Sequence, residues 1–380
     1  MSKIFLSKKY KYNEKSSLNL SKSQKNARLE IISNFKIGIL KWENNNCRCS
    51  VNKDLLICTR DYHGFNVRFV LCLNCGLIRE NPRISKDTID IFYEKHYRDL
   101  KNLSFSKLKP INNNGYFEQT YIKEMERGKI ILNYISKYTP LKAGLIFDFG
   151  TGTGGTLKIF KDAGFEIYGV DINEDFLNYG LKKGLNLKKG SIDELKNYPK
   201  KANIIIASHI LEHLHELDDY LKELRECLEK DGYLIVLLPG LMNIQYRVED
   251  LLDLFIIEHL YYFTLQTLTK ILLDNGFRFV NGNEEIIALF QKSTHKVYFK
   301  ISKDLIDNIL IYLRILDLPF PFNAIRIINN KRKIKYLILL NIISMLYKTK
   351  IINIIAILRD FLKQKLKLRN FLNRSYYRIS

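Results

Sequence analysis

The stretch that decides the fold is Leu145-Ile146-Phe147-Asp148-Phe149-Gly150-Thr151-Gly152-Thr153-Gly154, which runs directly into the amphipathic segment 155–163. A short apolar run that ends in closely spaced glycines predicts a buried strand, a tight loop and a helix. Glycines at the carboxyl end of a strand let a ligand approach the backbone where side chains would block it. We therefore expect a ligand-binding loop at the edge of a sheet.

Short apolar strands and amphipathic helices alternate after this loop. The predicted strands are 145–149, 166–171, 185–188, 203–208, 233–238, 277–280 and 286–290, and the predicted helices are 155–163, 174–183, 217–229 and 265–275. This alternation predicts an α/β fold with a mostly parallel, doubly wound sheet. Asp171 ends the second strand about twenty residues after the first, where an acidic side chain can accept hydrogen bonds from ribose hydroxyls.

The spacing of the glycines separates two classes of ligand. Dinucleotide-binding loops have their third glycine three residues after the second, which opens a pyrophosphate site at the helix N-terminus. Here the glycines alternate, and Asp148 lies two positions before the first of them. This form resembles the first motif of the class I S-adenosylmethionine-dependent methyltransferases, whose loop holds the methionine part of the cofactor. A tight turn without a ligand is the alternative.

The resemblance to this family continues along the domain. Residues 202–213, which end in His-Ile-Leu-Glu-His, resemble its fourth-strand segment, and residues 224–239 resemble its next helix and fifth strand. The resemblance implies a Rossmann-like, seven-stranded methyltransferase sheet. It also implies that the cofactor contacts Asp148, Gly150, Gly152, Gly154, Asp171, Ile172, Ser191 and Ile192. Whether Asp193 supplies the acidic group that the family has near the adenine stays open.

Five of the six cysteines lie within thirty residues, which favours metal binding over disulfides in a chain that starts without an apolar signal segment. Cys47-x-Cys49 and Cys72-x-x-Cys75 form two ligand pairs, and four thiolates suit a closed, structural zinc site. The first pair is one residue shorter than the usual spacing, so Cys58 could replace one ligand. Buried structural thiols are the alternative.

The cysteine-rich segment also resembles a known module. Cys72-Leu73-Asn74-Cys75-Gly76-Leu77-Ile78, followed by Asn81-Pro82-Arg83 and by Phe92-Tyr93, resembles the zinc-binding domain that precedes some bacterial sugar methyltransferases. Characterised members of that group are deoxysugar C-methyltransferases. The resemblance implies a sugar or glycan precursor as the acceptor, in surface polysaccharide biosynthesis.

One stretch carries the candidate catalytic residues. Glu258-His259-Leu260-Tyr261-Tyr262-Phe263-Thr264 resembles the stretch in which the sugar methyltransferases have an active-site histidine. The resemblance implies His259 as the general base, with Glu258, His213 and Glu212 as further candidates, because a neutral imidazole can take a proton near pH 7. A histidine that only orders the turn is the alternative. Ile256 replaces a tyrosine of the C-methyltransferases, whose extra C-terminal domain is also missing, so both O- and C-methylation stay open.

The charge is concentrated at the two ends of the chain. The net charge is +21, of which residues 1–41 carry +8 and residues 291–380 carry +15, leaving −2 for residues 42–290. A nucleic-acid enzyme would more often have its basic field around the cleft. The Asn/Asp-Pro-Pro-aromatic segment of base N-methyltransferases is also absent after the fourth strand. Nucleic acid is therefore a disfavoured partner. An RNA methyltransferase and a non-catalytic binding module are the competing functions.

The pattern predicts five regions. They are a basic N-terminal arm (1–41), a zinc-binding domain (42–100), a helical linker (101–140), the methyltransferase domain (141–292) and a basic amphipathic helical tail (293–380). Apolar stretches at 336–346 and 351–358 are too short to span a bilayer but suit contact with an anionic membrane surface. A helical cap or a dimer face is the alternative. We expect a cytoplasmic protein, with peripheral membrane contact through the tail.

Overall fold

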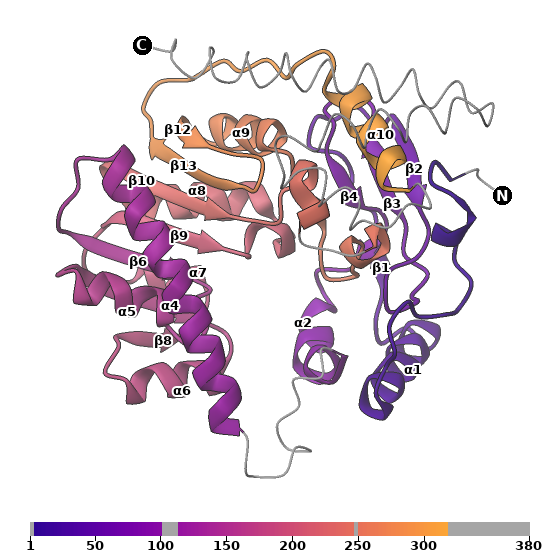
Figure 1. Ribbon diagram of the computed structural model, residues 1–380, viewed down its shortest axis with the longest axis horizontal. Helices are drawn as coiled ribbons and strands as arrows, with labels where there is room; N and C mark the ends of the chain where they lie inside the picture. The colour runs from indigo at the N-terminus through magenta and orange to yellow at the C-terminus, as the bar shows by residue number, and fades with distance from the viewer. Residues whose placement is uncertain (1–3, 101–112, 247–249, 318–380) are drawn as a thin grey trace, which may run out of the picture.

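The computed structural model describes residues 4–100, 113–246 and 250–317. Within these residues, a seven-stranded sheet between two layers of helices packs beside a smaller unit built on a four-stranded sheet (Figure 1). The segments 336–346 and 351–358, for which membrane contact is predicted, lie outside the described residues. Among the described helices, none combines the length and the apolar character that crossing a bilayer requires.

The large sheet has the strand order β12-β13-β10-β9-β6-β7-β8. Neighbouring strands from β8 to β10 are parallel, whereas β13 runs antiparallel to both β10 and β12. The strands are β6 (Leu145–Phe149), β7 (Glu166–Asp171), β8 (Leu187–Lys189), β9 (Ala202–Ser208), β10 (Leu228–Leu237), β12 (Phe277–Gly282) and β13 (Ile287–Lys292). The strand order changes direction at β6, because β7 and β8 follow it on one side of the sheet, whereas β9 and β10 lie on the other side. Open α/β sheets bind ligands at such a switch point, here between β6 and β9.

Side chains of the central strands alternate between two apolar cores. In β6, Leu145, Phe147 and Phe149 face one core, whereas Ile146 faces the other. Both cores are apolar because helices cover both faces of a parallel sheet. One face packs on α7 (Ile192–Lys196), α8 (Leu217–Cys227) and α9 (Leu265–Asp274), and the other packs on α4 (Asn113–Tyr138), α5 (Gly155–Asp162) and α6 (Glu174–Lys182).

Two glycines let α4 lie very close to α5. A Cβ atom on Gly128 would come within 2.8 Å of the carbonyl oxygen of Thr156, and one on Gly155 within 2.3 Å of that of Tyr121. Real Cβ atoms do not approach backbone atoms so closely, so both positions require glycine. The helix predicted as a linker therefore packs against the first helix of the large sheet.

The smaller unit has a sheet in the order β11-β4-β3-β2. These strands are β2 (Asp54–Cys58), β3 (Phe69–Cys72), β4 (Ile78–Glu80) and β11 (Tyr261–Tyr262), and a separate pair joins β1 (Trp42–Glu43) to β5 (Arg83–Ile84). β11 comes from the predicted catalytic stretch, nearly two hundred residues after β4 in the chain. The two sequence regions predicted as separate domains therefore share one small sheet.

The ends of the described chain also pack on this unit. The N-terminal region contains the 3-10 turn η1 (Lys8–Tyr10) and α1 (Lys22–Lys36), and Tyr10 and Ile31 are fully buried in the same apolar core as Phe69. Helix α10 (Leu305–Leu316) adds Ile309 to this core. The core of the smaller unit therefore includes residues before position 41 and after position 292, the two positions predicted as domain boundaries.

The segment that follows β5 forms an interrupted helix. It consists of α2 (Ile89–Ile91), the π-helical turn η2 (Phe92–Tyr97) and α3 (Arg98–Leu100). The π-helical turn directs Tyr93 toward the large domain, where its hydroxyl lies 3.5 Å from Nδ1 of His213. π-helical turns are rare and often occur at functional sites.

Candidate active site

The glycine loop has the backbone that the alternating pattern requires. Gly150, Gly152 and Gly154 all have positive φ, at 79°, 59° and 79°. A Cβ atom on Gly150 would lie 2.2 Å from Cδ1 of Ile210, at the end of β9, and one on Gly152 would lie 2.3 Å from Oε1 of Glu124. The loop therefore needs glycine both for its conformation and for its close neighbours.

Two aspartates frame this loop at the carboxyl ends of β6 and β7. Asp171 accepts hydrogen bonds from the backbone N–H groups of Gly152 and Asn173, both at 2.8 Å. Asp148 is 2% exposed and accepts one from the Thr151 hydroxyl at 3.1 Å. Burial raises the pKa of Asp148 to about 7 and also raises that of Asp171.

The residues around the loop fit an S-adenosylmethionine molecule. Oδ1 of Asp148 is buried without a hydrogen-bond partner among the described residues, so it is an acceptor suited to a ligand ammonium. Asp171 is at the position of the ribose-binding acid, and Ile172 after it is 66% exposed. A large apolar side chain exposed at that edge offers a surface to an aromatic ring.

The other two predicted cofactor residues lie at the start of α7. Ser191 is the N-cap of this helix but makes no capping hydrogen bond with its side chain. Ile192 is only 3% exposed and belongs to the apolar core beneath the sheet edge. Asp193 is mostly exposed and lies 3.5 Å from Lys196, so its carboxylate faces solvent.

Glu124 of α4 anchors the loop and was not predicted. Its carboxylate is buried and accepts hydrogen bonds from the backbone N–H groups of Thr153 (3.3 Å) and Gly155 (3.0 Å), and from the Thr153 hydroxyl (2.5 Å). These donors lie at the end of the glycine loop and at the N-terminus of α5, where a negative charge is also favoured by the helix dipole. Burial raises the pKa of Glu124, while these hydrogen bonds act in the opposite direction.

A group of imidazoles and carboxylates lies next to the glycine loop. His213 and His259 pack edge to face with their ring centroids 4.7 Å apart. The backbone N–H of Leu260 donates to the carbonyl of Glu212 at 2.8 Å, which joins the two segments. Ile210 connects this group to Gly150, as described above. The structure thus brings His213, Glu258 and His259 together, although 45 residues separate the first two in the chain.

The small sheet holds this group in place. β11 pairs Tyr261 with Arg79 and Tyr262 with Ile78, directly after His259. On β4, the side chain of Glu80 is fully buried, and its burial together with nearby Asp61 and Glu258 raises its pKa well above the usual range. Glu80 was not predicted because only the tertiary fold brings it near Glu258.

Four thiols gather in the smaller unit. Sγ of Cys47 lies 3.4 Å from that of Cys75 and 3.5 Å from that of Cys49, which is itself 3.5 Å from Cys72. Tetrahedral zinc with Zn–S bonds of about 2.3 Å separates its sulfur ligands by about 3.8 Å, so the four thiols fit one such ion. Cys58 is outside this group, since its thiol donates to the carbonyl of Arg60.

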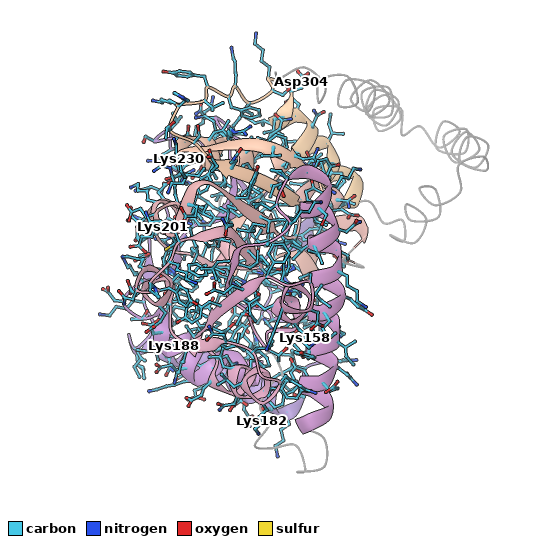
Figure 2. All side chains as sticks on the ribbon, turned by 90° about the vertical axis from the view of Figure 1, so that its left-hand side faces the viewer. Lys158, Lys182, Lys188, Lys201, Lys230 and Asp304 are labelled. Atoms are coloured by element: carbon cyan, nitrogen blue, oxygen red, sulfur yellow. The ribbon has the colours of Figure 1, made fainter. Side chains whose placement is uncertain are left out.

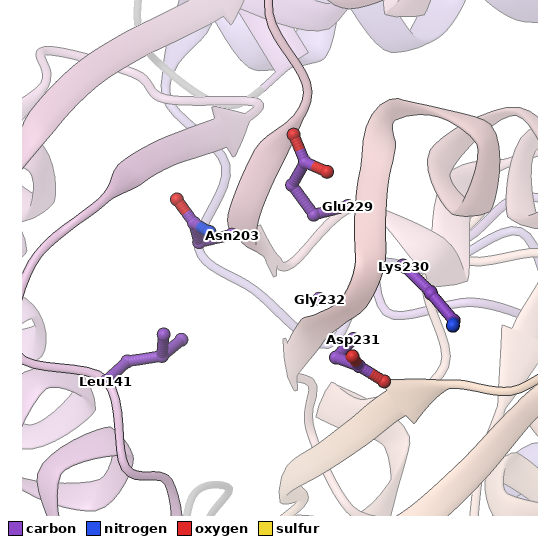
Figure 3. A pocket seen from close by; sticks show the side chains of 6 residues that line it. All are labelled: Leu141, Asn203, Glu229, Lys230, Asp231 and Gly232. Carbon is purple, nitrogen blue, oxygen red and sulfur yellow. The ribbon is translucent and has the colours of Figure 1, made fainter.

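A separate surface pocket lies at the opposite edge of the large sheet. It has a volume of about 310 Å³ and is lined by Leu141, Asn203, Glu229, Lys230, Asp231 and Gly232 (Figure 3). Leu141 precedes β6, and Asn203 lies near the start of β9, so the pocket is at the amino ends of these strands. The glycine loop follows their carboxyl ends, so the pocket is not part of the candidate active site.

Comparisons with known proteins agree with the geometry of the loop. Residues 126–281 match a family described as "Methyltransferase domain". The chain is 29% identical over 138 residues to a ubiquinone biosynthesis O-methyltransferase of Pelagibacter ubique (strain HTCC1062), which covers 34% of this chain and 55% of that protein. It is 23% identical over 142 residues to the C-methyltransferase NovU of Streptomyces niveus, covering 36% and 33%.

Solved structures with a similar domain include an S-adenosylmethionine-dependent methyltransferase from Mesorhizobium loti. It is 15% identical, with a TM-score of 0.35, and the similarity covers 42% of this chain and 94% of that one. The chain spans about half the length of the first relative named above and a third of the second. The family match over residues 126–281 shows that this part of the chain is an S-adenosylmethionine-dependent methyltransferase domain.

Proposed function

We propose that this protein transfers a methyl group from S-adenosylmethionine to a small-molecule acceptor, a sugar or glycan precursor. The observation that carries the proposal is the group formed by buried Glu258 and the half-buried His213 and His259 beside the glycine loop, held there by a strand of the cysteine-rich unit. When bound, the cofactor supplies an electrophilic methyl carbon. The residues of this chain would position the acceptor and remove its proton.

Proton removal is assigned to this imidazole and carboxylate group, with His259 and His213 as its proposed catalytic residues. Nδ1 of His213 lies 2.8 Å from the carbonyl oxygen of Glu258. A carbonyl only accepts, so Nδ1 carries the proton and Nε2 has a free lone pair in the neutral ring. The geometry suits loss of a proton from a hydroxyl or from a carbon next to a carbonyl, so O- and C-methylation both stay within the proposal.

A small acceptor is favoured over nucleic acid by the distribution of surface charge. Lysines are spread along one side of the large domain, as Figure 2 shows for Lys158, Lys188 and Lys201. Two of these pair with neighbouring acids, Lys158 with Asp162 at 2.5 Å and Lys188 with Glu194 at 3.0 Å. Paired lysines contribute little to a basic surface that could track a phosphate backbone.

The proposal includes one structural zinc ion held by Cys47, Cys49, Cys72 and Cys75. The four Sγ atoms lie close enough together for one tetrahedral ion, and zinc binds cysteine as the thiolate. The ion would stabilise the turn before β4 and so, indirectly, the position of β11 and His259.

The test of the proposed function is methyl transfer from labelled S-adenosylmethionine to a panel of nucleotide-linked sugars and lipid-linked glycans. We expect label in at least one of these acceptors, and loss of that transfer in His259→Ala. His295→Ala is the matched control, because His295 is exposed and remote from the loop. Transfer that is unchanged by His259→Ala would remove this residue from the proposal, and label only in RNA would contradict the acceptor class.

Peripheral contact with a membrane through the basic tail is part of the proposal. Truncation after residue 317 is the suitable test, since α10 ends at Leu316 and Asp317 binds the N-terminal region through Ser7 (2.6 Å between side chains). We expect the truncated protein to lose binding to vesicles that contain anionic lipid. Equal binding by the truncated and full chains would contradict this contact.

A further inference from the structure

Glu212 is a buried carboxylate without the partners that burial usually requires. Its side chain is 2% exposed, and neither oxygen has a hydrogen-bond partner among the described residues. The nearest group that could carry a positive charge is Nδ1 of His209, at 3.5 Å from Oε1. Burying a carboxylate costs free energy unless it is hydrogen-bonded, paired or bound to a cation.

The region around Glu212 has an excess of acidic groups. Glu258 is 2% exposed on the segment before β11, and Glu80 is fully buried on β4. Tyr93, from η2, lies close to Glu258, Glu212 and Glu80, which all act on its hydroxyl. Arg83, on β5, offsets part of the negative charge at Glu80. A bound cation would balance this charge.

His213 is oriented as a metal ligand usually is. Its Nδ1–H donates to the Glu258 carbonyl at 2.8 Å, and the Tyr93 hydroxyl lies 3.5 Å from the same atom. In metal sites, a ligating histidine almost always donates its second ring N–H to a carbonyl or carboxylate, which fixes the ring and exposes the other nitrogen. The ring of His259 lies against it, 4.7 Å between centroids.

We propose that Glu212, His213 and His259 bind one divalent transition-metal ion, such as Mn²⁺, Fe²⁺ or Co²⁺. One ligand atom from each residue lies within 4.8 Å of the others. Ligands of one such ion are about 3 Å apart, so binding would draw the three side chains closer together. Two imidazoles with one carboxylate suit first-row transition metals and disfavour Mg²⁺, which prefers oxygen ligands.

Three protein ligands leave open positions on such an ion, and these would face the acceptor. The inference deepens the proposed function, and its catalytic meaning rests on that function, whereas metal binding can be measured without it. With the ion present, His259 assists proton loss as a ligand, because a bound cation makes an acceptor hydroxyl more acidic. His209, outside the ligand set and 38% exposed, is then placed to receive the proton.

The test is a titration of the zinc-loaded full chain with Mn²⁺, in which electron paramagnetic resonance measures the free Mn²⁺. Zinc fills the four thiols first, and thiolates do not favour Mn²⁺. We expect the wild-type chain to bind one Mn²⁺. In Glu212→Gln and His259→Gln we expect the affinity for Mn²⁺ to fall about 100-fold, which is the upper end of the loss seen when a metal site is weakened. His295→Gln, an exposed histidine elsewhere, should bind Mn²⁺ like the wild type.

Thermal melting separates loss of the ion from loss of the fold. Glu212 has no hydrogen-bonded partner among the described residues, so metal-free Glu212→Gln should melt no lower than the metal-free wild type. Mn²⁺ should raise the melting temperature of the wild type but not that of Glu212→Gln. Absence of bound Mn²⁺ in the wild type, or equal binding by Glu212→Gln, overturns the metal site. Mn²⁺ binding without any methyl transfer would leave the site standing and would contradict the proposed function instead.

Discussion

Glu124 provides the sharpest test of how the glycine loop is held. In Glu124→Gln the shape of the side chain is retained, but one carboxylate oxygen becomes an NH₂ group that faces the N–H donors at the end of the glycine loop and the start of α5. At least one of the buried donors, Thr153 N or Gly155 N, then loses its acceptor. An unsatisfied buried donor costs about 1–3 kcal/mol.

Part of this cost is offset in the variant. Burial raises the pKa of Glu124, so the native carboxylate itself carries a desolvation cost that the neutral amide lacks. We therefore expect a net loss of about 1–2 kcal/mol of stability for Glu124→Gln. Because the affected donors belong to the loop and its helix, we also expect S-adenosylhomocysteine to bind about tenfold more weakly, which corresponds to about 1.4 kcal/mol.

Urea unfolding, monitored by circular dichroism, measures the stability. Titration calorimetry measures the affinity for S-adenosylhomocysteine. Glu126→Gln is the matched control, because Glu126 is exposed two residues further along the same helix. If Glu124→Gln and Glu126→Gln have the same unfolding midpoint and the same affinity, the assignment of Glu124 as the anchor of the loop is wrong.

Three further predictions follow from the geometry. Burial raises the pKa of Asp148 in the folded protein to about 7. The neutral carboxyl therefore favours the folded, ligand-free protein: its full contribution to stability is present below about pH 4 and is lost as the pH rises through about 7. S-adenosylhomocysteine, whose ammonium favours the ionised carboxylate, should bind up to about tenfold more tightly per pH unit from 5.5 to 7, and calorimetry should find this dependence absent in Asp148→Asn. Gly128→Val should lower the unfolding free energy by about 1–3 kcal/mol, because its side chain would meet the Thr156 carbonyl; an unchanged urea midpoint would refute the close packing of α4 on α5. Cys75→Ser should abolish the bound zinc measured by atomic emission, whereas Cys227→Ser, a buried thiol outside the cluster, should retain it; equal zinc in both variants would contradict the four-thiol site.

Much of the large sheet could be predicted because each strand there is a local apolar run. The predicted strands 145–149 and 166–171 coincide with β6 and β7, since both are buried on two faces and end at turn residues. The register of β10 is irregular between Leu228 and Tyr233, so its regular part begins at the predicted residue. The seven-stranded α/β fold is confirmed. The short helix α7 was missed because five residues show no clear period.

The composition of the site was harder to predict, because much of it depends on contacts between distant segments. The local motifs predict the glycines, Asp171 and His259 as site residues, each next to a recognisable turn, and these roles stay predictions. Glu124 lies in a helix that reads as an ordinary amphipathic segment, and no local signal marks it as the acceptor of loop N–H groups. Glu80 and Glu258 become neighbours only because β11 pairs with β4.

The central claim is that the loop from Asp148 to Gly154, with Asp171, binds S-adenosylmethionine. Titration calorimetry with S-adenosylhomocysteine tests it most directly, with NADH as the competing ligand. We predict one S-adenosylhomocysteine site per chain, at least about tenfold weaker in Asp171→Asn and unchanged in Asp175→Asn, which alters an exposed aspartate on the next helix. Binding of NADH in place of S-adenosylhomocysteine, or equal affinity in the two variants, would contradict it.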